Sequence, residues 1–353
     1  MGLALLLAAA LSGEFPAERM YRVADLAPGI FAFVSPETSG PVPSGNVAAI
    51  VGDDGVLVVD SGRFPTLAKR MIAEIRKRTD KPVRFLVHTH WHLDHMVGDG
   101  EFANAFPQMR FLSTDFTRRK MAEKQAPYLA GIEKIDNGAL QFLEERVRTR
   151  TGLDGSPASE PLLAYLKSQI EDVRLERSEL PGAAVVTPDL TFSSALTVHL
   201  GKREVRILFL GKGNTAGDTV VQVPDAKVVA TGDLLVAPVP YGYGCHPEEW
   251  IETLKKLMTI DAAAIVPGHG PVMRDWEYAK KVSGLLEAVR SQVRQAASEG
   301  ATLPEVRKHV NLSSWRKAFA GDDVNRGFAF DDFFARSAID RAWQEARGSM
   351  AEE

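Results

Sequence analysis

A cluster of histidines directly after a short apolar run restricts the fold of this chain more than any other feature. Half of the eight histidines fall within eight residues, namely His88, His90, His92 and His95. Residues 83–87, immediately before them, have the apolar and β-branched composition of a buried strand. Because α/β folds commonly keep their functional loops at the carboxyl ends of strands, the cluster predicts a site at the edge of a sheet.

The spacing within the cluster is typical of a metal site. Side chains two residues apart in an extended segment point the same way, so His90 and His92 can bind one ion. Asp94 and His95 follow where the chain turns, and we expect them to face a second ion. The alternative is a solvated loop or a group of packed core histidines. We favour that alternative only for His88, which we expect to pack behind the site.

Strand and helix patterns divide the rest of the chain into a core and two helical parts. Short apolar runs bounded by turn residues predict strands at residues 30–34, 47–51, 56–59, 83–87, 196–200, 205–210, 219–223, 228–231 and 264–267. Helical spacing predicts a helix that begins at a capping Thr66, another at 248–258, and helices within 115–180 and beyond 276. We therefore expect an α/β core at 21–275, with a helical insertion at about 115–180 and a helical C-terminal extension at 276–353.

Residues 1–20 form a separate N-terminal segment with two interpretations. Its apolar run at 3–11 is followed by Ser12 and Gly13, which suits either a signal peptide or an N-terminal helix. A signal peptide would direct the protein to the periplasm or outside the cell, whereas a helix would leave it in the cytoplasm. The run is too short to cross a bilayer, and no other segment is a candidate for a membrane span.

Composition narrows the expected partners and ligand chemistry. The formal net charge of -4 gives no support for a nucleic-acid surface, which normally has a basic excess. The one cysteine, Cys245, excludes a disulfide within the chain and a thiolate metal cluster, and we expect it to be a small buried residue. A small-molecule substrate is therefore the expected partner, and the sequence does not indicate the oligomeric state.

The histidine cluster resembles the signature of a known family. His90-x-His92-x-Asp94-His95 matches the H-x-H-x-D-H signature of the metallo-β-lactamase superfamily. Residues 58–62 resemble the family's strand-ending segment before the signature, 231–233 the segment of the bridging aspartate, and 267–270 the segment of the last histidine. The resemblance covers roughly residues 30–272. It implies an α/β fold of the αββα sandwich type, with two similar halves.

The resemblance also implies one or two zinc ions per chain. The ligands of the first would be His90, His92 and Asn214, those of the second Asp94, His95 and His269, and Asp233 would bridge both. The implied chemistry is hydrolysis by a hydroxide that the cations generate near neutral pH. Asp94 and Asp233 would be the catalytic residues, with Asp94 orienting the nucleophile.

Position 214 departs from the family pattern, because Asn214 stands where a histidine is usual. An asparagine offers only a neutral carbonyl oxygen, which is a weaker ligand for zinc than an imidazole. We therefore expect the first metal to bind more weakly than the second.

The expected function is metal-dependent hydrolysis of an ester, thioester, lactone or cyclic amide in a small molecule. Family β-lactamases generally lack the bridging aspartate supplied here by Asp233, so β-lactamase-like activity is an alternative. If Asn214 abolishes metal loading, the chain is instead a non-catalytic scaffold or binding protein. We expect the insertion to cover the mouth of the site. The loop at 240–246, with His246, reads as a pocket wall or a surface turn, and the loop at 39–45 as a flap or a plain connection.

Overall fold

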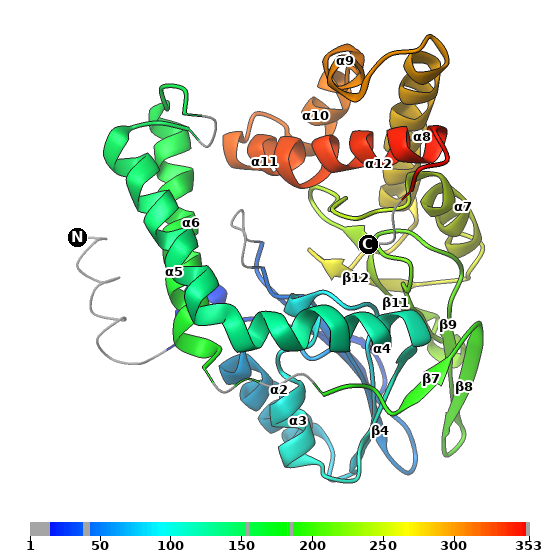
Figure 1. Ribbon diagram of the computed structural model, residues 1–353. Helices are drawn as coiled ribbons and strands as arrows, with labels where there is room; N and C mark the ends of the chain where they lie inside the picture. The colour runs from blue at the N-terminus through cyan, green and yellow to red at the C-terminus, as the bar shows by residue number, and fades with distance from the viewer. Residues whose placement is uncertain (1–14, 38–42, 153–154, 182, 184–185, 351–353) are drawn as a thin grey trace.

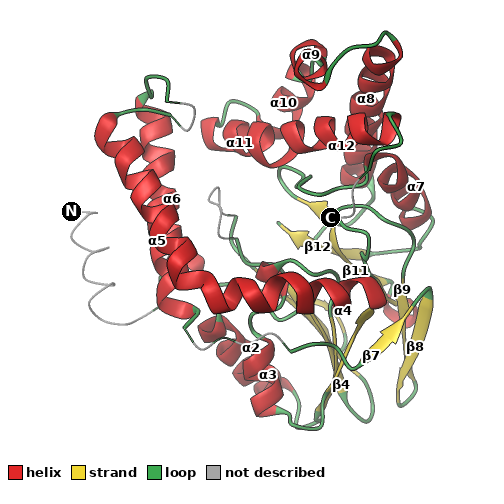
Figure 2. Ribbon diagram, viewed as in Figure 1, coloured by secondary structure: helices red, strands yellow, loops and turns green. Residues whose placement is uncertain are grey.

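Two β-sheets pack face to face, and helices cover their outer faces (Figure 1). The computed structural model describes residues 15–37, 43–152, 155–181, 183 and 186–350. Figure 2 shows α2 (Pro65–Arg78) and α3 (Asp99–Ala105) on one side of the strands, and α7 (Pro247–Leu257) and α8 (Glu277–Ser298) on the other. The αββα sandwich predicted from the sequence is confirmed.

The first sheet has seven strands in the order of the chain. They are β1 (Arg22–Ala27), β2 (Ile30–Val34), β3 (Val47–Val51), β4 (Val56–Val59), β5 (Val83–Val87), β6 (Arg110–Thr114) and β7 (Leu190–Phe192). Strands β1 to β4 pair antiparallel, whereas β4 to β7 pair parallel. The carboxyl ends of β4, β5 and β6 therefore lie along one edge of the sheet.

The second sheet has five strands in the order β12-β11-β10-β9-β8. They are β8 (Ala195–Leu200), β9 (Arg203–Leu208), β10 (Val220–Val223), β11 (Val228–Val236) and β12 (Ala264–His269). Strands β11 and β12 run parallel, and the other neighbours run antiparallel. The carboxyl ends of β11 and β12 thus also lie side by side.

Side chains that alternate along the strands fill the layers of the sandwich. In β2, Phe31 and Phe33 pack against the outer helices, whereas Ile30, Ala32 and Val34 face the second sheet. The period of two along a strand explains this division, and it requires apolar residues on both faces. The strands around the site are consequently held from both sides.

The predicted helical insertion is confirmed, and buried ion pairs hold it against the core. It consists of α4 (Asp115–Lys120), a π-helical turn (Met121–Gln125), α5 (Ala126–Thr149) and α6 (Glu160–Glu179). Three carboxylates on one face of α6 bind groups of the core: Asp172 pairs with Arg19, Glu176 with Arg63, and Glu179 accepts hydrogen bonds from Thr66. The insertion therefore has a fixed position.

Replacing Glu176 by glutamine is expected to lower the free energy of unfolding by about 2 kcal/mol, because a buried guanidinium loses its charged partner. Arg63 and Glu176 are only 7% and 3% exposed, so water cannot replace the lost interaction. Urea unfolding measures the effect. Glu171→Gln is the control on the same helix, since Glu171 pairs with Arg174 in solvent. Equal stability of both variants would show that the buried pair contributes nothing.

The predicted helical C-terminal extension is also confirmed, and it reaches the insertion. It contains α8, α9 (Leu303–His309), α10 (Ser313–Ala320), α11 (Val324–Ala329), a π-helical turn (Phe330–Ala335) and α12 (Arg336–Ala346). In Figure 1, α11 lies near α6, and the rings of Phe328 and Tyr165 join them with centroids 5.4 Å apart. Two segments that are distant in sequence thus meet above the edge where the strands end.

Several details differ from the sequence expectations. Thr66 does not cap α2, because the helix begins at Pro65 and the Thr66 hydroxyl donates to Glu179. Strands β1, β6 and β7 and helix α3 were not predicted, and β11 continues to Val236 rather than ending at residue 231. The apolar run at 3–11 and most of the loop at 39–45 lie outside the described residues. Within the described part of the chain, no helix is long and apolar enough to span a membrane.

Candidate metal centre

The sequence-predicted ligands converge where strands of both sheets end. The loop after β5 supplies His90, His92, Asp94 and His95, β11 supplies Asp233, and β12 ends with His269. Parallel pairing of β4 with β5 and of β11 with β12 brings these ends together. The histidine cluster, placed from sequence at the end of a strand, does lie there.

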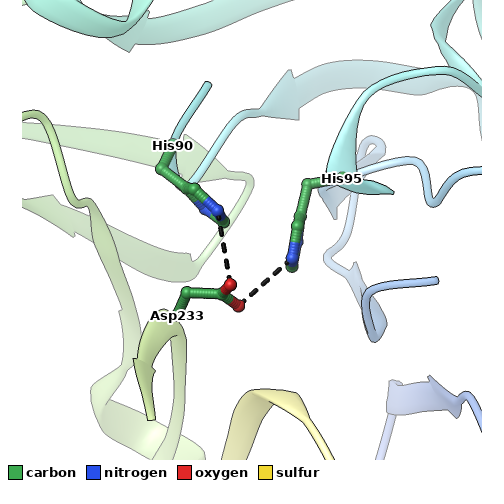
Figure 3. Close-up of side chains that lie close together, drawn as sticks. All are labelled: His90, His95 and Asp233. Carbon is green, nitrogen blue, oxygen red and sulfur yellow. Dashed lines mark ion pairs between the residues drawn. The ribbon is translucent and has the colours of Figure 1, made fainter. Parts of the chain in front are cut away.

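One group of possible ligands consists of His90, His95 and Asp233 (Figure 3). The carboxylate of Asp233 lies between the two imidazoles, with its Oδ2 3.5 Å from Nε2 of His90 and its Oδ1 3.2 Å from Nε2 of His95. All three side chains are buried. An aspartate between two imidazoles has the position expected of a bridging ligand.

A second group consists of Asp94, His95 and His269, so His95 belongs to both groups. Nε2 of His269 lies 2.9 Å from Oδ2 of Asp94 and 3.2 Å from Nε2 of His95. His95 Nε2 is also 3.4 Å from the same carboxylate oxygen. Three donors of this kind at these separations can surround one small divalent cation.

His92 lies beside these groups but belongs to neither. Its ring meets that of His90 edge to face, with the centroids 4.6 Å apart, and it borders the cavity described below. Burial, together with the charge of His90, lowers the pKa of His92 to about 3. The ring is therefore neutral near pH 7, which is the form that binds a metal.

Asn214 is also in the site, and its amide is oriented by the backbone. The side chain is fully buried, and Nδ2 donates a hydrogen bond of 2.7 Å to the carbonyl oxygen of Tyr241. Oδ1 is buried without a hydrogen-bond partner, as is Nε2 of His90. A buried acceptor without a partner is unfavourable. A cation bound between these two atoms would supply the partner that no described side chain provides.

The donor set as a whole fits zinc. Imidazole nitrogens and carboxylate oxygens are the usual ligands of catalytic zinc, and one amide oxygen is available as a weaker donor. Burial raises the pKa of Asp233, but His95, His269 and His90 outweigh that effect and lower it. The carboxylate is therefore ionised at neutral pH and can bind a cation.

Asp60, at the end of β4, orients two of the ligand imidazoles. Its carboxylate accepts hydrogen bonds from the backbone N and the Oγ1 of Thr89 and from Nδ1 of His95, each 2.8 Å long. Thr89 Oγ1 lies 2.9 Å from Nδ1 of His90. The hydroxyl of Thr89 donates its proton to the carboxylate of Asp60. Its oxygen therefore accepts the hydrogen bond from Nδ1 of His90. With Nδ1 of each ring held in these hydrogen bonds, Nε2 of both histidines is the nitrogen that faces the metal position.

The pattern of residues 58–62 resembles a family segment but did not by itself indicate a role for Asp60. The signal was present, since the residue directly follows a buried strand. Its backbone also has a φ of 60°, which is uncommon for a residue other than glycine. Such a conformation at a site is typical of a side chain whose direction has to be fixed.

The other residues considered from sequence are not ligands of these groups. His88 is fully buried behind the site and its Nε2 lies 2.9 Å from Oδ2 of Asp99, as expected for a packed histidine. Cys245 is buried, which confirms its interpretation as a small core residue. His246 precedes α7, donates its backbone N–H to Gly213, and does not border the cavity described next.

Four of the candidate ligands form the floor of a cavity of about 550 Å³, namely His92, Asp94, Asp233 and His269. Its walls come from distant parts of the chain: residues 35–37, 43–44, 91–94 and 236–241, with Gln125, Tyr128, Arg326, Ala329 and Phe333. Gln125 and Tyr128 belong to the insertion, in agreement with the expectation that it covers the mouth. The contribution of the C-terminal extension, through α11 and the following turn, was not predicted.

The cavity wall is largely apolar and aromatic. Trp91, Tyr241 and Phe333 border it together with Val236 and Val239. Such walls suit a small molecule with a sizeable apolar part, since ligand sites of this volume usually bury most of their ligand.

The two arginines at the cavity already have acidic partners. Arg63 pairs with Glu176, and Arg326 binds Glu37 through two hydrogen bonds of 2.7 and 2.9 Å. Among the described residues that border the cavity, these are the permanently charged cations. The wall therefore offers little unbalanced positive charge to an anionic substrate.

A two-sheet α/β sandwich with a buried cluster of histidines and aspartates at its strand ends defines a class of metal-binding proteins. Residues 40–269 match the profile of the Metallo-beta-lactamase superfamily, and the chain belongs to that family.

Two kinds of enzyme are found among the curated proteins that this chain resembles. The chain is 22% identical over 284 residues to a linear primary-alkylsulfatase from Pseudomonas sp., covering 74% of the chain and 49% of the relative. It is 29% identical over 167 residues to a hydroxyacylglutathione hydrolase from Brucella ovis, covering 44% of the chain and 61% of the relative. The chain thus spans about half to three fifths of the length of these relatives.

Comparison with solved structures shows the same fold. A metallo-beta-lactamase from Pontibacter korlensis has a TM-score of 0.53 at 20% identity, covering 76% of this chain and 99% of that chain. The sec-alkylsulfatase Pisa1 from Pseudomonas sp. has a TM-score of 0.62 at 14% identity, covering 92% of this chain and 50% of that chain. At these identities the likeness concerns the fold alone.

Proposed function

We propose that the protein is a metal-dependent hydrolase that cleaves an ester, thioester, lactone or cyclic amide in a largely apolar small molecule. The observation that carries this proposal is the pair of ligand groups that share His95 and that border an apolar cavity through Asp94, Asp233 and His269. A binding protein without catalysis would not need buried carboxylates and imidazoles grouped in this way.

In this proposal zinc is held as the family resemblance implies. One ion would take His90, His92 and the amide oxygen of Asn214, and the other Asp94, His95 and His269, with Asp233 between them. Zinc in such a site supplies a Lewis acid and lowers the pKa of water toward neutrality, so that no basic side chain has to generate the nucleophile. Figure 3 shows the position of Asp233 between two of the imidazoles.

The chain's own residues orient the reactants. Asp94 borders the cavity, and its Oδ2 lies near Nε2 of both His95 and His269. The neighbouring His95 and His269 outweigh burial and lower the pKa of Asp94, so the carboxylate is ionised and can accept a hydrogen bond from the attacking water. Asp60 meanwhile keeps His90 and His95 in the tautomer that presents Nε2.

The paired arginines of the cavity favour an uncharged substrate. An ester or lactone with an apolar substituent would lie against Trp91 and Phe333 without requiring a free cation. A sulfate ester of an alkyl chain is the second candidate, because alignment with the alkylsulfatase covers 74% of this chain. The thioester relative, by comparison, aligns with 44% of the chain.

Elemental analysis combined with a substrate panel tests the proposal. Protein purified without chelator is expected to contain at least one zinc per chain and to hydrolyse apolar esters, lactones or thioesters faster than alkyl sulfates and β-lactams. Removal of the metal should abolish the activity, and added zinc should restore it. A folded, metal-free and inactive protein would favour the scaffold alternative, and faster cleavage of alkyl sulfates would favour the second candidate.

A further inference from the structure

Tyr241 lies at the metal centre on the loop that follows β11. Its side chain borders the cavity together with Asp94 and Asp233, and its ring meets that of His92 edge to face at a centroid distance of 5.7 Å. No other tyrosine in the described part of the chain has its ring packed against the ring of a candidate ligand. Burial and the nearby carboxylates of Asp94 and Asp233 raise the pKa of Tyr241, as expected for a hydroxyl on the same side of the cavity as these groups.

Two contacts fix the backbone at this position. The carbonyl oxygen of Tyr241 accepts a 2.7 Å hydrogen bond from Nδ2 of Asn214. The next residue, Gly242, donates its N–H to the carbonyl oxygen of Phe333, at 2.8 Å. The ring of Phe333 also packs against that of Tyr241, with centroids 6.0 Å apart. The tyrosine is thus held between a candidate ligand and the C-terminal extension.

The hydroxyl of Tyr241 makes no hydrogen bond within the described part of the protein. By contrast, the buried hydroxyl of Tyr278 donates to the carbonyl oxygen of Val236 at 2.6 Å. A tyrosine hydroxyl in a mostly buried position usually has a partner, since it carries both a donor and an acceptor. At the cavity wall, the natural partner of the Tyr241 hydroxyl is a bound substrate.

We propose that Tyr241 is a catalytic residue whose hydroxyl donates a hydrogen bond to the substrate oxygen that becomes negatively charged during hydrolysis. This inference rests on the proposed function. Attack forms a bond between the water oxygen and the carbonyl carbon, and the π electrons of the carbonyl move to its oxygen. When the tetrahedral intermediate collapses, those electrons re-form the double bond, the bond to the leaving group breaks, and the leaving group takes up the proton released by water. Tyr241 keeps its own proton throughout and stabilises only the oxyanion.

Tyr241→Phe tests the proposal because it removes the hydroxyl and keeps the ring against His92 and Phe333. We expect kcat on the best ester of the panel to fall about 100–1,000-fold, with KM changed less than about twofold. The zinc content should remain that of the natural protein. The control is Tyr21→Phe, whose ring packs against Phe33 in the core outside the first sheet, and it should behave as the natural protein.

A second measurement does not depend on turnover. An alkyl phosphonate monoester, which has the tetrahedral anionic shape of the intermediate, should bind the zinc-loaded Tyr241→Phe protein about tenfold more weakly in calorimetry. Unchanged kcat and phosphonate binding in an active protein would overturn the role of Tyr241, as would a loss of zinc, which would make it a support of the metal site. If the natural protein hydrolyses nothing in the panel, the proposed function itself fails. That result is separate from either outcome for Tyr241.

Discussion

Asp233→Ala is expected to abolish hydrolysis, with a loss larger than the ~10–100-fold that follows removal of a group merely supporting a metal site. The carboxylate of Asp233 is within 3.6 Å of the imidazole Nε2 atoms of His90, His95 and His269, so its removal affects both ligand groups. The zinc content should fall together with the activity. Kinetic assays and elemental analysis of the same preparation measure the two effects.

The metal-free form of Asp233→Ala should unfold at nearly the same temperature as the metal-free natural protein. Without a cation, the ion-pair partners of Asp233 in the described part of the chain are the ligand imidazoles. Of these, His95 and His269 keep other carboxylate partners in Asp60 and Asp94, so the metal-free fold loses little with the Asp233 carboxylate. Asp225→Ala is the control, because Asp225 lies in a turn of the same sheet and pairs with Arg203 near the surface. If the metal-free Asp233→Ala protein collapses as well, Asp233 supports the fold rather than the metals.

Much of the sandwich could be predicted because its strands are buried on both faces. Continuous apolar runs such as those of β2, β3 and β4 are recognisable without any neighbour. Two of the strands that escaped prediction, β1 and β7, lack this property, whereas β6 is buried but ends in the polar residues Ser113 and Thr114. Strand β1 lies at the edge of its sheet with most side chains partly or fully exposed, and β7 has only three residues. Their strand conformation depends on pairing with a neighbour rather than on local composition.

Helix α2 shows how a tertiary contact can replace a local signal. Thr66 is a residue type that commonly caps helices, and its position before an apolar face favoured that role. In the structure Glu179 of the insertion accepts both the backbone N–H and the hydroxyl of Thr66. The free backbone N–H at the start of the helix therefore finds its acceptor at a sequence separation of 113 residues. No local pattern contains that partner.

In the candidate site, too, one part could be predicted from the sequence and another part could not. His90, Asp94, His95 and His269 could be selected from sequence, because their spacing and segments carry a chemical pattern. The cavity walls could not, since Phe333 reaches the site only through helix packing and its backbone bond to Gly242. Substrate preference is therefore the property that the sequence revealed least, because it depends on side chains brought together by the insertion and the extension.

The first metal position is expected to be the weaker one, and Asn214→His should strengthen it by about 10–100-fold. The amide of Asn214 is fixed by its bond to the carbonyl oxygen of Tyr241, so a neutral Oδ1 is the only atom it can offer. An imidazole is a better donor for zinc, and its second nitrogen can donate to the same carbonyl. A zinc titration against a chromophoric chelator should therefore show two steps in the natural protein and closer affinities in the variant.

Asn137→His is the control, because it adds an imidazole on α5, away from the candidate ligands. It should leave both binding steps unchanged. Two equally tight sites in the natural protein, unaffected by Asn214→His, would contradict the prediction. His88 could not then be the missing ligand, since it is bound to Asp99 behind the site, and His246 does not border the cavity. The fixed amide oxygen of Asn214 would itself have to bind zinc as well as an imidazole does, which its orientation by Tyr241 would explain.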